Sequence, residues 1–149
     1  MTTAPDAPVP ASEPRTAVVD EPLDVAAHLD AVADPHAGAI ANFIGVVRDH
    51  DPEAAGTVVE LRYSSHPDAP RILREIADRF ATDGVLIAVS HRIGTLTVGD
   101  LALVCAVSTA HRAQAFEICR ELVERVKAEL PIWKQQETDD GSSHWVGLT

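Results

Sequence analysis

Residues 108–134 read STAHRAQAFEICRELVERVKAELPIWK, and the rest of the chain is organised around this stretch. Between its ends, apolar residues recur at spacings of three and four, which predicts an amphipathic helix with one face on a core. These residues are Ala115, Ile118, Cys119, Leu122, Val126 and Leu130. We expect Ser108 and Thr109 to cap the helix start, because hydroxyl side chains satisfy free backbone N–H groups there. Pro131 should end the helix, since proline lacks an N–H and disfavours helical geometry in the preceding residue.

Both ends of the predicted helix carry basic side chains. His111 and Arg112 fall in or beside the first turn, where the helix dipole favours an anion over a cation. A bound phosphate or carboxylate would make this placement a binding site, although His111 could instead be a simple capping residue. Lys127 and Lys134 flank the bend at Pro131 and are the only two lysines, against ten arginines. They suggest a need for a compact amine that can lose its proton, the alternative being two solvated surface charges.

Strands and helices alternate in part along the remaining sequence. Strands are predicted at residues 16–19, 38–47, 57–63, 85–90 and 101–109, helices at 23–32 and 68–81, and a closing edge strand at Trp145-Val146. The run GAIANFIGVV at 38–47 is mostly apolar and predicts a buried strand. This alternation favours an α/β or α+β sandwich with a mixed sheet over an all-helical bundle. Residues 1–15 are rich in proline, alanine and small polar residues, so we expect a disordered tail followed by one domain at 16–149.

The composition argues against several classes of protein. A net charge of −11 speaks against a nucleic-acid binder. No run approaches the roughly 18 apolar residues of a membrane span, and no signal peptide is recognised, so we expect a cytoplasmic protein. The histidines show no metal-ligand spacing and the glycines no phosphate-binding loop, so neither a metal nor a cofactor is expected. Cys105 and Cys119 lie in apolar patterns and are predicted to be buried thiols rather than a disulfide or persulfide carriers.

A third basic position is Arg48, which follows the apolar run at 38–47. Strand ends and helix starts are where folds with mixed sheets and helices place ligand sites. If Arg48 converges with His111-Arg112 and with the two lysines, the result is a pocket for an anionic small molecule. Arginine would then hold a phosphate through paired donors, and a partly buried lysine would act as acid, base or nucleophile. The alternative for Arg48 is a surface ion pair with Asp49 or Asp51.

Four runs of the chain, in this order, resemble the family of catalytic large subunits of molybdopterin synthase. They are GAIANFIGVVRDH, SHRIGTLTVGD, AVSTAHRAQAFEIC and VKAELPIWK, and the similarity covers about residues 18–146. The resemblance implies an α+β fold, the α/β hammerhead, in which a mixed sheet packs with helices beside a small antiparallel sheet. It also implies a cytoplasmic sulfurtransferase that converts cyclic pyranopterin monophosphate (precursor Z) to molybdopterin by installing two dithiolene sulfurs.

The resemblance further implies partners and site residues. The sulfur would arrive as a thiocarboxylate on the C-terminal Gly-Gly tail of a small ubiquitin-like subunit, within a heterotetramer built on a homodimer of the large subunit. The catalytic lysines fall on Lys127 and Lys134. The substrate-binding residues fall on Val46, Val47, Arg48, His111, Arg112, Lys127, Lys134, Gln135 and Gln136. The competing hypothesis is a non-catalytic protein that binds the small subunit, a pterin or another anion, and the presence of both lysines favours the enzyme.

Overall fold

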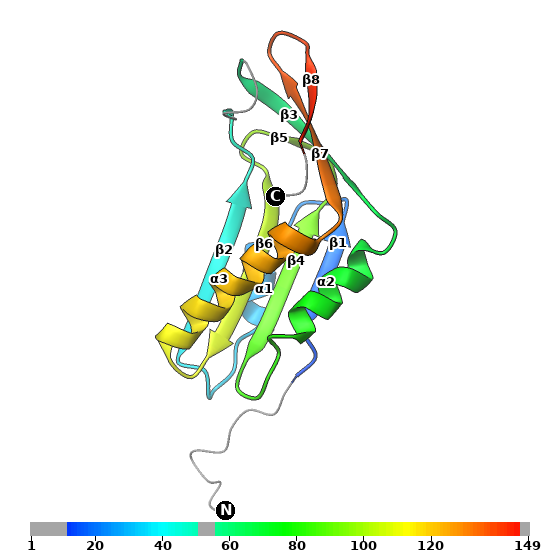
Figure 1. The fold of residues 1–149 in the computed structure, drawn as a ribbon. Helices are drawn as coiled ribbons and strands as arrows, with labels where there is room; N and C mark the ends of the chain where they lie inside the picture. The colour runs from blue at the N-terminus through cyan, green and yellow to red at the C-terminus, as the bar shows by residue number, and fades with distance from the viewer. Residues whose placement is uncertain (1–11, 51–55, 147–149) are drawn as a thin grey trace, which may run out of the picture.

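Residues 12–50 and 56–146 are described in the computed structural model, and they form two four-stranded sheets, one beyond the other along the molecule (Figure 1). The main sheet contains, in spatial order, β1 (Arg15–Val19), β4 (Leu86–Arg92), β6 (Leu101–Thr109) and β2 (Ala39–Val46). The smaller sheet contains β5 (Gly94–Thr97), β3 (Val58–Ser65), β7 (Ile132–Thr138) and β8 (Ser143–Val146). The β1–β4 pair is parallel and the other pairs are antiparallel. The predicted α+β fold, with a mixed sheet and a small antiparallel sheet, is confirmed.

Three helices cover the main sheet in the described part of the chain. Helices α2 (Ala69–Asp78) and α3 (Arg112–Glu129) lie on one face, and the short α1 (Val25–Ala31) lies on the other (Figure 1). The largest fully buried side chains between the sheet and the α2–α3 layer include Leu73, Ile76, Val89, Leu103 and Leu122. Burying each such side chain stabilises the fold by about 1.5–3 kcal/mol. This core fixes the direction of α3, whose last turn therefore ends at the smaller sheet.

The start of α3 differs from the prediction. Ser108 and Thr109 are the last residues of β6 and are fully buried, so the expectation that they cap the helix is wrong. Their hydroxyls instead donate to the backbone carbonyls of Val32 and His111, each at 2.6 Å. The N-cap residue is His111, in extended geometry, and Arg112 is the first helical residue. The prediction that the His-Arg pair lies at the helix start is confirmed.

The end of α3 follows the prediction. Leu130 leaves helical geometry, with φ −72° and ψ 123°, and the chain continues from Ile132 as β7. Leu130 and Ile132 are both buried, which anchors the bend from either side of Pro131. The bend therefore fixes the position of Lys127, in the last turn of α3, relative to Lys134 in β7.

Strand β2 is not buried in the described chain, so that prediction is wrong. It is an edge strand of the main sheet, and Ala41 is the only one of its eight residues that is buried. Four large apolar side chains remain exposed, Ile40 at 46%, Phe43 at 37%, Ile44 at 36% and Val46 at 53%. An uncovered apolar edge strand is a surface that associates with another chain. The prediction of a strand is confirmed, but its apolar side chains are not covered by the described residues of this chain.

Smaller differences concern the element boundaries. β1 begins at Arg15, one residue before the expected domain start, and most of the predicted tail, residues 1–11, lies outside the described residues. α1 begins after Asp24, whose carboxylate accepts a hydrogen bond from Ala27 N at 3.1 Å. β5 was not predicted from the sequence. Cys105 and Cys119 are buried and free, as predicted. No helix of the described residues is long and apolar enough to cross a membrane.

Candidate functional site

Lys127 and Lys134 reach the same hollow, where the two sheets meet. We call it the lysine hollow; it has a volume of about 120 Å³. It is lined by Gly45, Val46, Val47, Arg48, His50, Val58, Leu61, Tyr63, Ala102, Lys127, Lys134 and Gln136. The contributing segments are the end of β2, β3, the start of β6, the last turn of α3, and β7. Two of the three basic clusters predicted from the sequence therefore converge.

The pairing of β3 with β7 decides which side chains face the lysine hollow. Tyr63 lies directly opposite Lys134, and Leu61 directly opposite Gln136. Residues directly opposite each other in an antiparallel pair place their side chains on the same face, and the next residue along each strand faces the other way. Gln135 accordingly lies on the opposite face of the smaller sheet, where it lines a separate hollow with Glu60 and Arg62. Its assignment to substrate binding stays a prediction, and its position in one chain does not support it.

The segment after β2 is held by backbone hydrogen bonds to the turn between β5 and β6. Val47 N donates to Asp100 O at 2.9 Å, and Gly99 N donates to Val47 O at 2.8 Å. These bonds bury Val47 and leave Arg48 exposed at the rim of the lysine hollow. No described acidic residue forms an ion pair with Arg48, and Asp51 lies outside the described residues. The guanidinium is thus available to a ligand at this rim.

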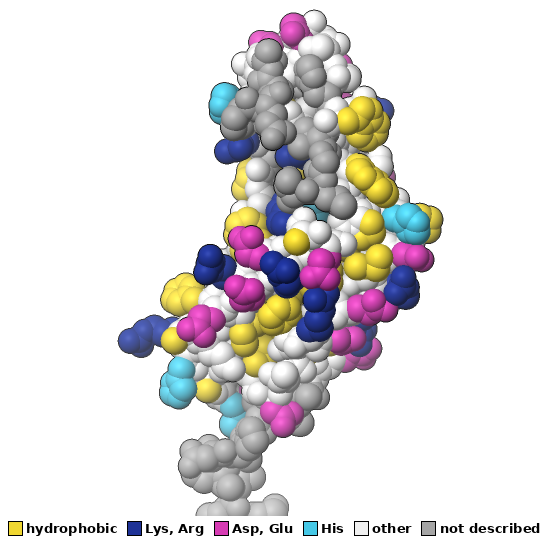
Figure 2. All heavy atoms as spheres, in the orientation of Figure 1, with side chains coloured by type: hydrophobic (Ala, Val, Ile, Leu, Met, Phe, Trp, Pro, Cys, Tyr) yellow, Lys and Arg dark blue, Asp and Glu magenta, His cyan; other side chains and the backbone are white. Residues whose placement is uncertain are grey.

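The charges in the lysine hollow are of one sign. The pKa of Lys127 is lowered from its ordinary value, first by burial and then by the positive charge of Lys134. No aspartate or glutamate is among the described residues that line the hollow, although the chain as a whole carries a net charge of −11. Elsewhere on the α2–α3 face, acidic and basic side chains are interspersed (Figure 2). A bound anion would relieve the repulsion between the two lysines, so this arrangement favours an anionic ligand.

His111 and Arg112 do not reach the lysine hollow of their own chain. Both side chains are exposed at the start of α3. With a rise of about 1.5 Å per residue, Arg112 lies about 22 Å along the helix axis from Lys127. The third predicted cluster is therefore at the other end of the helix, and in a single chain the convergence holds for Arg48 and the lysines alone.

Six residues that line the lysine hollow were not among the predicted site residues: Gly45, His50, Val58, Leu61, Tyr63 and Ala102. Of these, Tyr63 packs edge to face against the buried His91, with ring centroids 5.1 Å apart and an interplanar angle of 74°. Burial raises the pKa of Tyr63 to about 12. The pKa of His91 is lowered to about 4, mainly by burial and further by Lys127. The alternation in residues 57–63 could have placed Tyr63 on the same face of a strand as Leu61.

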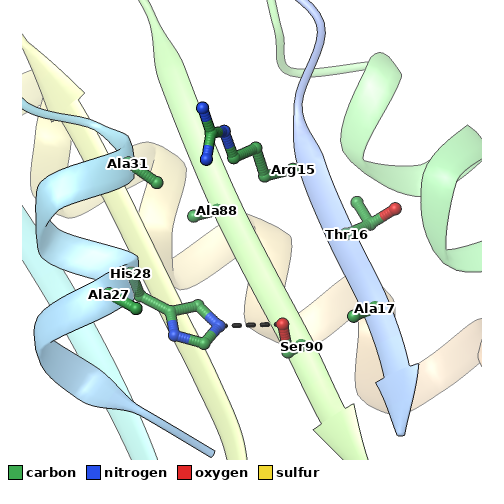
Figure 3. Close-up of a pocket in the computed structure, with 8 residues that line it drawn as sticks. All are labelled: Arg15, Thr16, Ala17, Ala27, His28, Ala31, Ala88 and Ser90. Atoms are coloured by element: carbon green, nitrogen blue, oxygen red, sulfur yellow. Dashed lines mark hydrogen bonds between the residues drawn. The ribbon is translucent and has the colours of Figure 1, made fainter.

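A second hollow lies on the opposite face of the main sheet, between α1, β1 and β4 (Figure 3). We call it the α1 hollow; it has a volume of about 190 Å³ and a floor of alanine side chains. His28 Nε2 lies 2.8 Å from Ser90 Oγ, and His28 Nδ1 donates to Asp24 O at 2.6 Å. Since a carbonyl can only accept, Nδ1 carries the proton and Nε2 accepts from the Ser90 hydroxyl when the ring is neutral. These bonds fasten α1 to the sheet.

Comparisons with known proteins agree with this geometry. A family model described as MoaE protein matches residues 18–129. Molybdopterin synthase catalytic subunit 1 of Mycobacterium tuberculosis is 39% identical over 139 residues, which is 90% of this chain and 91% of that protein. The crystal structure of molybdopterin synthase from Staphylococcus aureus superposes with a TM-score of 0.80 at 32% identity, covering 87% of this chain and 95% of that one.

A more distant structure shares the fold. It is a complex of subunits 1 and 2 of the molybdopterin-converting factor from Helicobacter pylori, with a TM-score of 0.65 at 19% identity, covering 89% of this chain and 88% of that one.

Among the described residues, no group of three or more His, Cys, Asp or Glu side chains is arranged to hold a metal ion.

Proposed function

This chain belongs to the MoaE protein family, and from that membership we propose that it is the catalytic subunit of a molybdopterin synthase, acting in molybdenum-cofactor biosynthesis. The observation that carries the proposal is the lysine hollow. Its two half-buried amines, Lys127 and Lys134, are the only lysines of the chain, and they share a hollow in which no described residue is acidic. Such a site holds an anion and offers an amine of lowered pKa for chemistry.

The proposed reaction is sulfur transfer to precursor Z, which thereby becomes molybdopterin. Lys127, whose pKa is lowered by burial and by the charge of Lys134, is suited to act as base or nucleophile. Lys134 acts as the charged partner that stabilises negative charge developing during transfer. Arg48 at the rim holds the cyclic phosphate of the substrate through paired donors. Val46, Val47 and Gln136 form the wall against which the pterin lies.

The sulfur donor in this proposal is a small ubiquitin-like subunit that carries a C-terminal Gly-Gly thiocarboxylate. The Helicobacter pylori structure that shares this fold is a two-subunit complex, which supports a partner of this kind. A thiocarboxylate is an anion, and the lysine hollow supplies two cations and no described carboxylate to receive it. Transfer of two sulfurs requires two donor tails to enter the same hollow in turn.

The proposed assembly is a homodimer of this chain with a small subunit on each copy. Strand β2 connects the two places that one chain keeps apart: Ala39 at its start pairs with Thr109, close to His111, and Val46 at its end lines the lysine hollow. Two copies related by a two-fold axis, with their exposed β2 edges side by side and antiparallel, set the start of one strand beside the end of the other. His111 and Arg112 of one copy then complete the lysine hollow of its partner.

The same dimer explains the uncovered apolar surface. The second copy would cover the exposed apolar side chains of β2 and α3, which are Ile40, Phe43, Ile44, Val46 and Phe116, the last at 67% exposure.

Within this proposal the protein is cytoplasmic, and the free, buried state of Cys105 and Cys119 is the one a reducing compartment maintains. Residues 16–149 form a single domain that follows an N-terminal tail.

The function is tested by reconstitution. The purified chain is mixed with precursor Z and a thiocarboxylated small subunit, and molybdopterin is measured through its fluorescent oxidation product. Product above a control without this chain is the expected result. A complex that forms on a sizing column and yields no product would instead support the non-catalytic hypothesis, in which the chain binds its partner without transferring sulfur.

A further inference from the structure

On the basis of the function proposed above, we propose that the Tyr63 hydroxyl is a further substrate-contacting group of the lysine hollow, a neutral hydrogen-bond donor to the anionic reactant held between Lys127 and Lys134. Neither lysine pairs with an acid that lines the hollow, so an anion there is surrounded by donors. Tyr63 adds a donor without adding a third positive charge.

The register of β3 and β7 fixes the place of Tyr63. It is the residue directly opposite Lys134, so its side chain leaves the smaller sheet on the same face and lines the same hollow. The ring is half-buried, and it is the only tyrosine of the chain. Among the described residues, no hydrogen bond is formed by its hydroxyl. Because Tyr63 lines the lysine hollow, its hydroxyl is placed to donate a hydrogen bond to a molecule bound there.

The protonation state of the Tyr63 phenol suits a hydrogen-bond donor. Burial raises the pKa of Tyr63 to about 12, so the phenol keeps its proton throughout the pH range in which proteins work. Lys127 differs, because burial and the charge of Lys134 lower its pKa and so favour loss of its proton. The hollow therefore combines an amine that can lose a proton with a hydroxyl that does not. A fixed neutral donor aimed at developing negative charge is a common means of stabilising a transition state.

His91 is the positioning residue for this ring. It is 4% exposed, and its Nδ1–H donates to the carbonyl of Arg92 at 2.7 Å, which fixes the plane of the imidazole. The rings of Tyr63 and His91 pack edge to face, so the imidazole supports the phenol ring. Lys127 contributes to lowering the pKa of His91 to about 4. A neutral His91 supports Tyr63 without repelling the lysines.

The main test is Tyr63→Phe, which removes the hydroxyl and keeps the ring against His91. In the reconstituted complex, we expect kcat/KM for precursor Z to fall about 10- to 100-fold, the usual effect of losing a hydrogen bond to a charged group. The melting temperature and small-subunit binding should stay close to those of the wild type. Ser90→Ala is the matched control, because it removes a hydroxyl from the α1 hollow and should leave turnover unchanged. Wild-type kcat and KM in Tyr63→Phe would overturn the proposal.

A second measurement does not depend on turnover. Because the chain has one tyrosine, incorporation of 3-fluorotyrosine gives a single fluorine NMR signal from Tyr63. We expect this signal to shift when a small subunit with its Gly-Gly tail is added, and to stay in place with a subunit that lacks the tail. Equal spectra with both subunits would count against Tyr63. Failure of the wild type to make product, with the tail-dependent shift present, would count against the proposed function and leave Tyr63 as a tail contact.

The role of His91 is tested by two replacements. His91→Phe keeps an aromatic ring against Tyr63, whereas His91→Gln keeps a hydrogen-bond donor and loses the ring. We expect the phenylalanine variant to retain more of the wild-type kcat, with KM little changed in either. The opposite order at equal melting temperature would show that His91 does not act by positioning Tyr63.

Discussion

The lysine hollow and the α1 hollow differ in a way that volume does not capture. The α1 hollow has a volume of about 190 Å³ and the lysine hollow one of about 120 Å³. Its imidazole and hydroxyl are bonded to each other, with His28 held between Ser90 and Asp24 O. In the lysine hollow, two amines repel each other and a phenol lacks a partner among the described residues. Charged groups without partners, rather than cavity volume, distinguish a reactive site from a packing contact between a helix and a sheet.

The two hollows also differ in how the chain builds them. The α1 hollow lies beside β1 and β4, adjacent strands of one sheet, and its floor is formed by alanines that leave space under a short helix. The lysine hollow draws on both sheets and on the last turn of α3. Basic side chains that come from distant segments can meet in one hollow without an acidic side chain beside them, because the core fixes the position of each segment. The packing of α3 on the core places Lys127, partly buried, in the same hollow as Lys134.

Replacing either lysine should have the largest effect on activity. Lys127→Ala and Lys134→Ala should each lower kcat/KM in the reconstituted assay by at least about 100-fold, because each removes a group that acts on charge in the transition state. Arg125→Ala is the matched control, since it removes an exposed positive charge from the same helix and should have little effect. Full activity in both lysine variants would show that the lysine hollow is not the catalytic site.

The next effect concerns the second copy. Arg112→Ala and Lys127→Ala should each be nearly inactive, yet a refolded equimolar mixture should recover activity. If the site combines Lys127 of one copy with Arg112 of the other, random pairing leaves about a quarter of the sites intact. Mixing without refolding is the control, because the subunits then have no chance to exchange. An inactive refolded mixture that elutes as a dimer would place both residues in the same site of one chain, contrary to their separation along α3.

A smaller effect is a pH dependence of stability caused by His91. Its pKa is about 4 in the folded chain against 6.5 ordinarily, so between these values the unfolded state binds a proton that the folded state does not. Stability should therefore fall as pH decreases through this window, by about 2–3 kcal/mol more in the wild type than in His91→Phe. Urea unfolding above and below the window measures the difference. Parallel pH profiles in the two proteins would mean that burial does not depress this pKa.

The smallest effect is expected at the α1 hollow. Ser90→Ala should lower the free energy of unfolding by about 1 kcal/mol, the usual contribution of a buried hydrogen bond, since it leaves His28 Nε2 without its partner. Turnover in the reconstituted assay should not change. If turnover falls by more than the lower stability can account for, the α1 hollow has a role in the reaction. The proposed difference between the two hollows would then be wrong.

Much of the fold was visible in the sequence, because local patterns dictated it. The spacing of apolar residues gave α3, and Pro131 gave its end. The start of α3 was misplaced because the apolar run of β6 continues directly into Ser108 and Thr109, and buried hydroxyls resemble capping ones in sequence. The burial of β2 was misjudged because an apolar run does not say whether its own chain or another copy covers it.

The site was predictable where residues lie at the ends of local elements. Arg48, Lys127 and Lys134 fall into this class, and they converge. Gln135 and Gln136 could not be separated from sequence, because a shift of one residue in the register of β7 against β3 exchanges the two faces. The neighbourhood of Tyr63 and Lys134 likewise depends on pairing between strands far apart in the chain, which no local pattern reveals.

The most direct test of the central claim is to locate the tail of the small subunit. A small subunit with a photoreactive group at its C-terminus is bound to the full chain, irradiated, and the attached peptides are identified by mass spectrometry. Attachment to the segments that carry Arg48, Tyr63, Lys127 and Lys134 is the result we predict. Attachment to the segments around His28 and Ser90, or to neither hollow in a complex that forms and turns over, would contradict the assignment of the lysine hollow as the catalytic site.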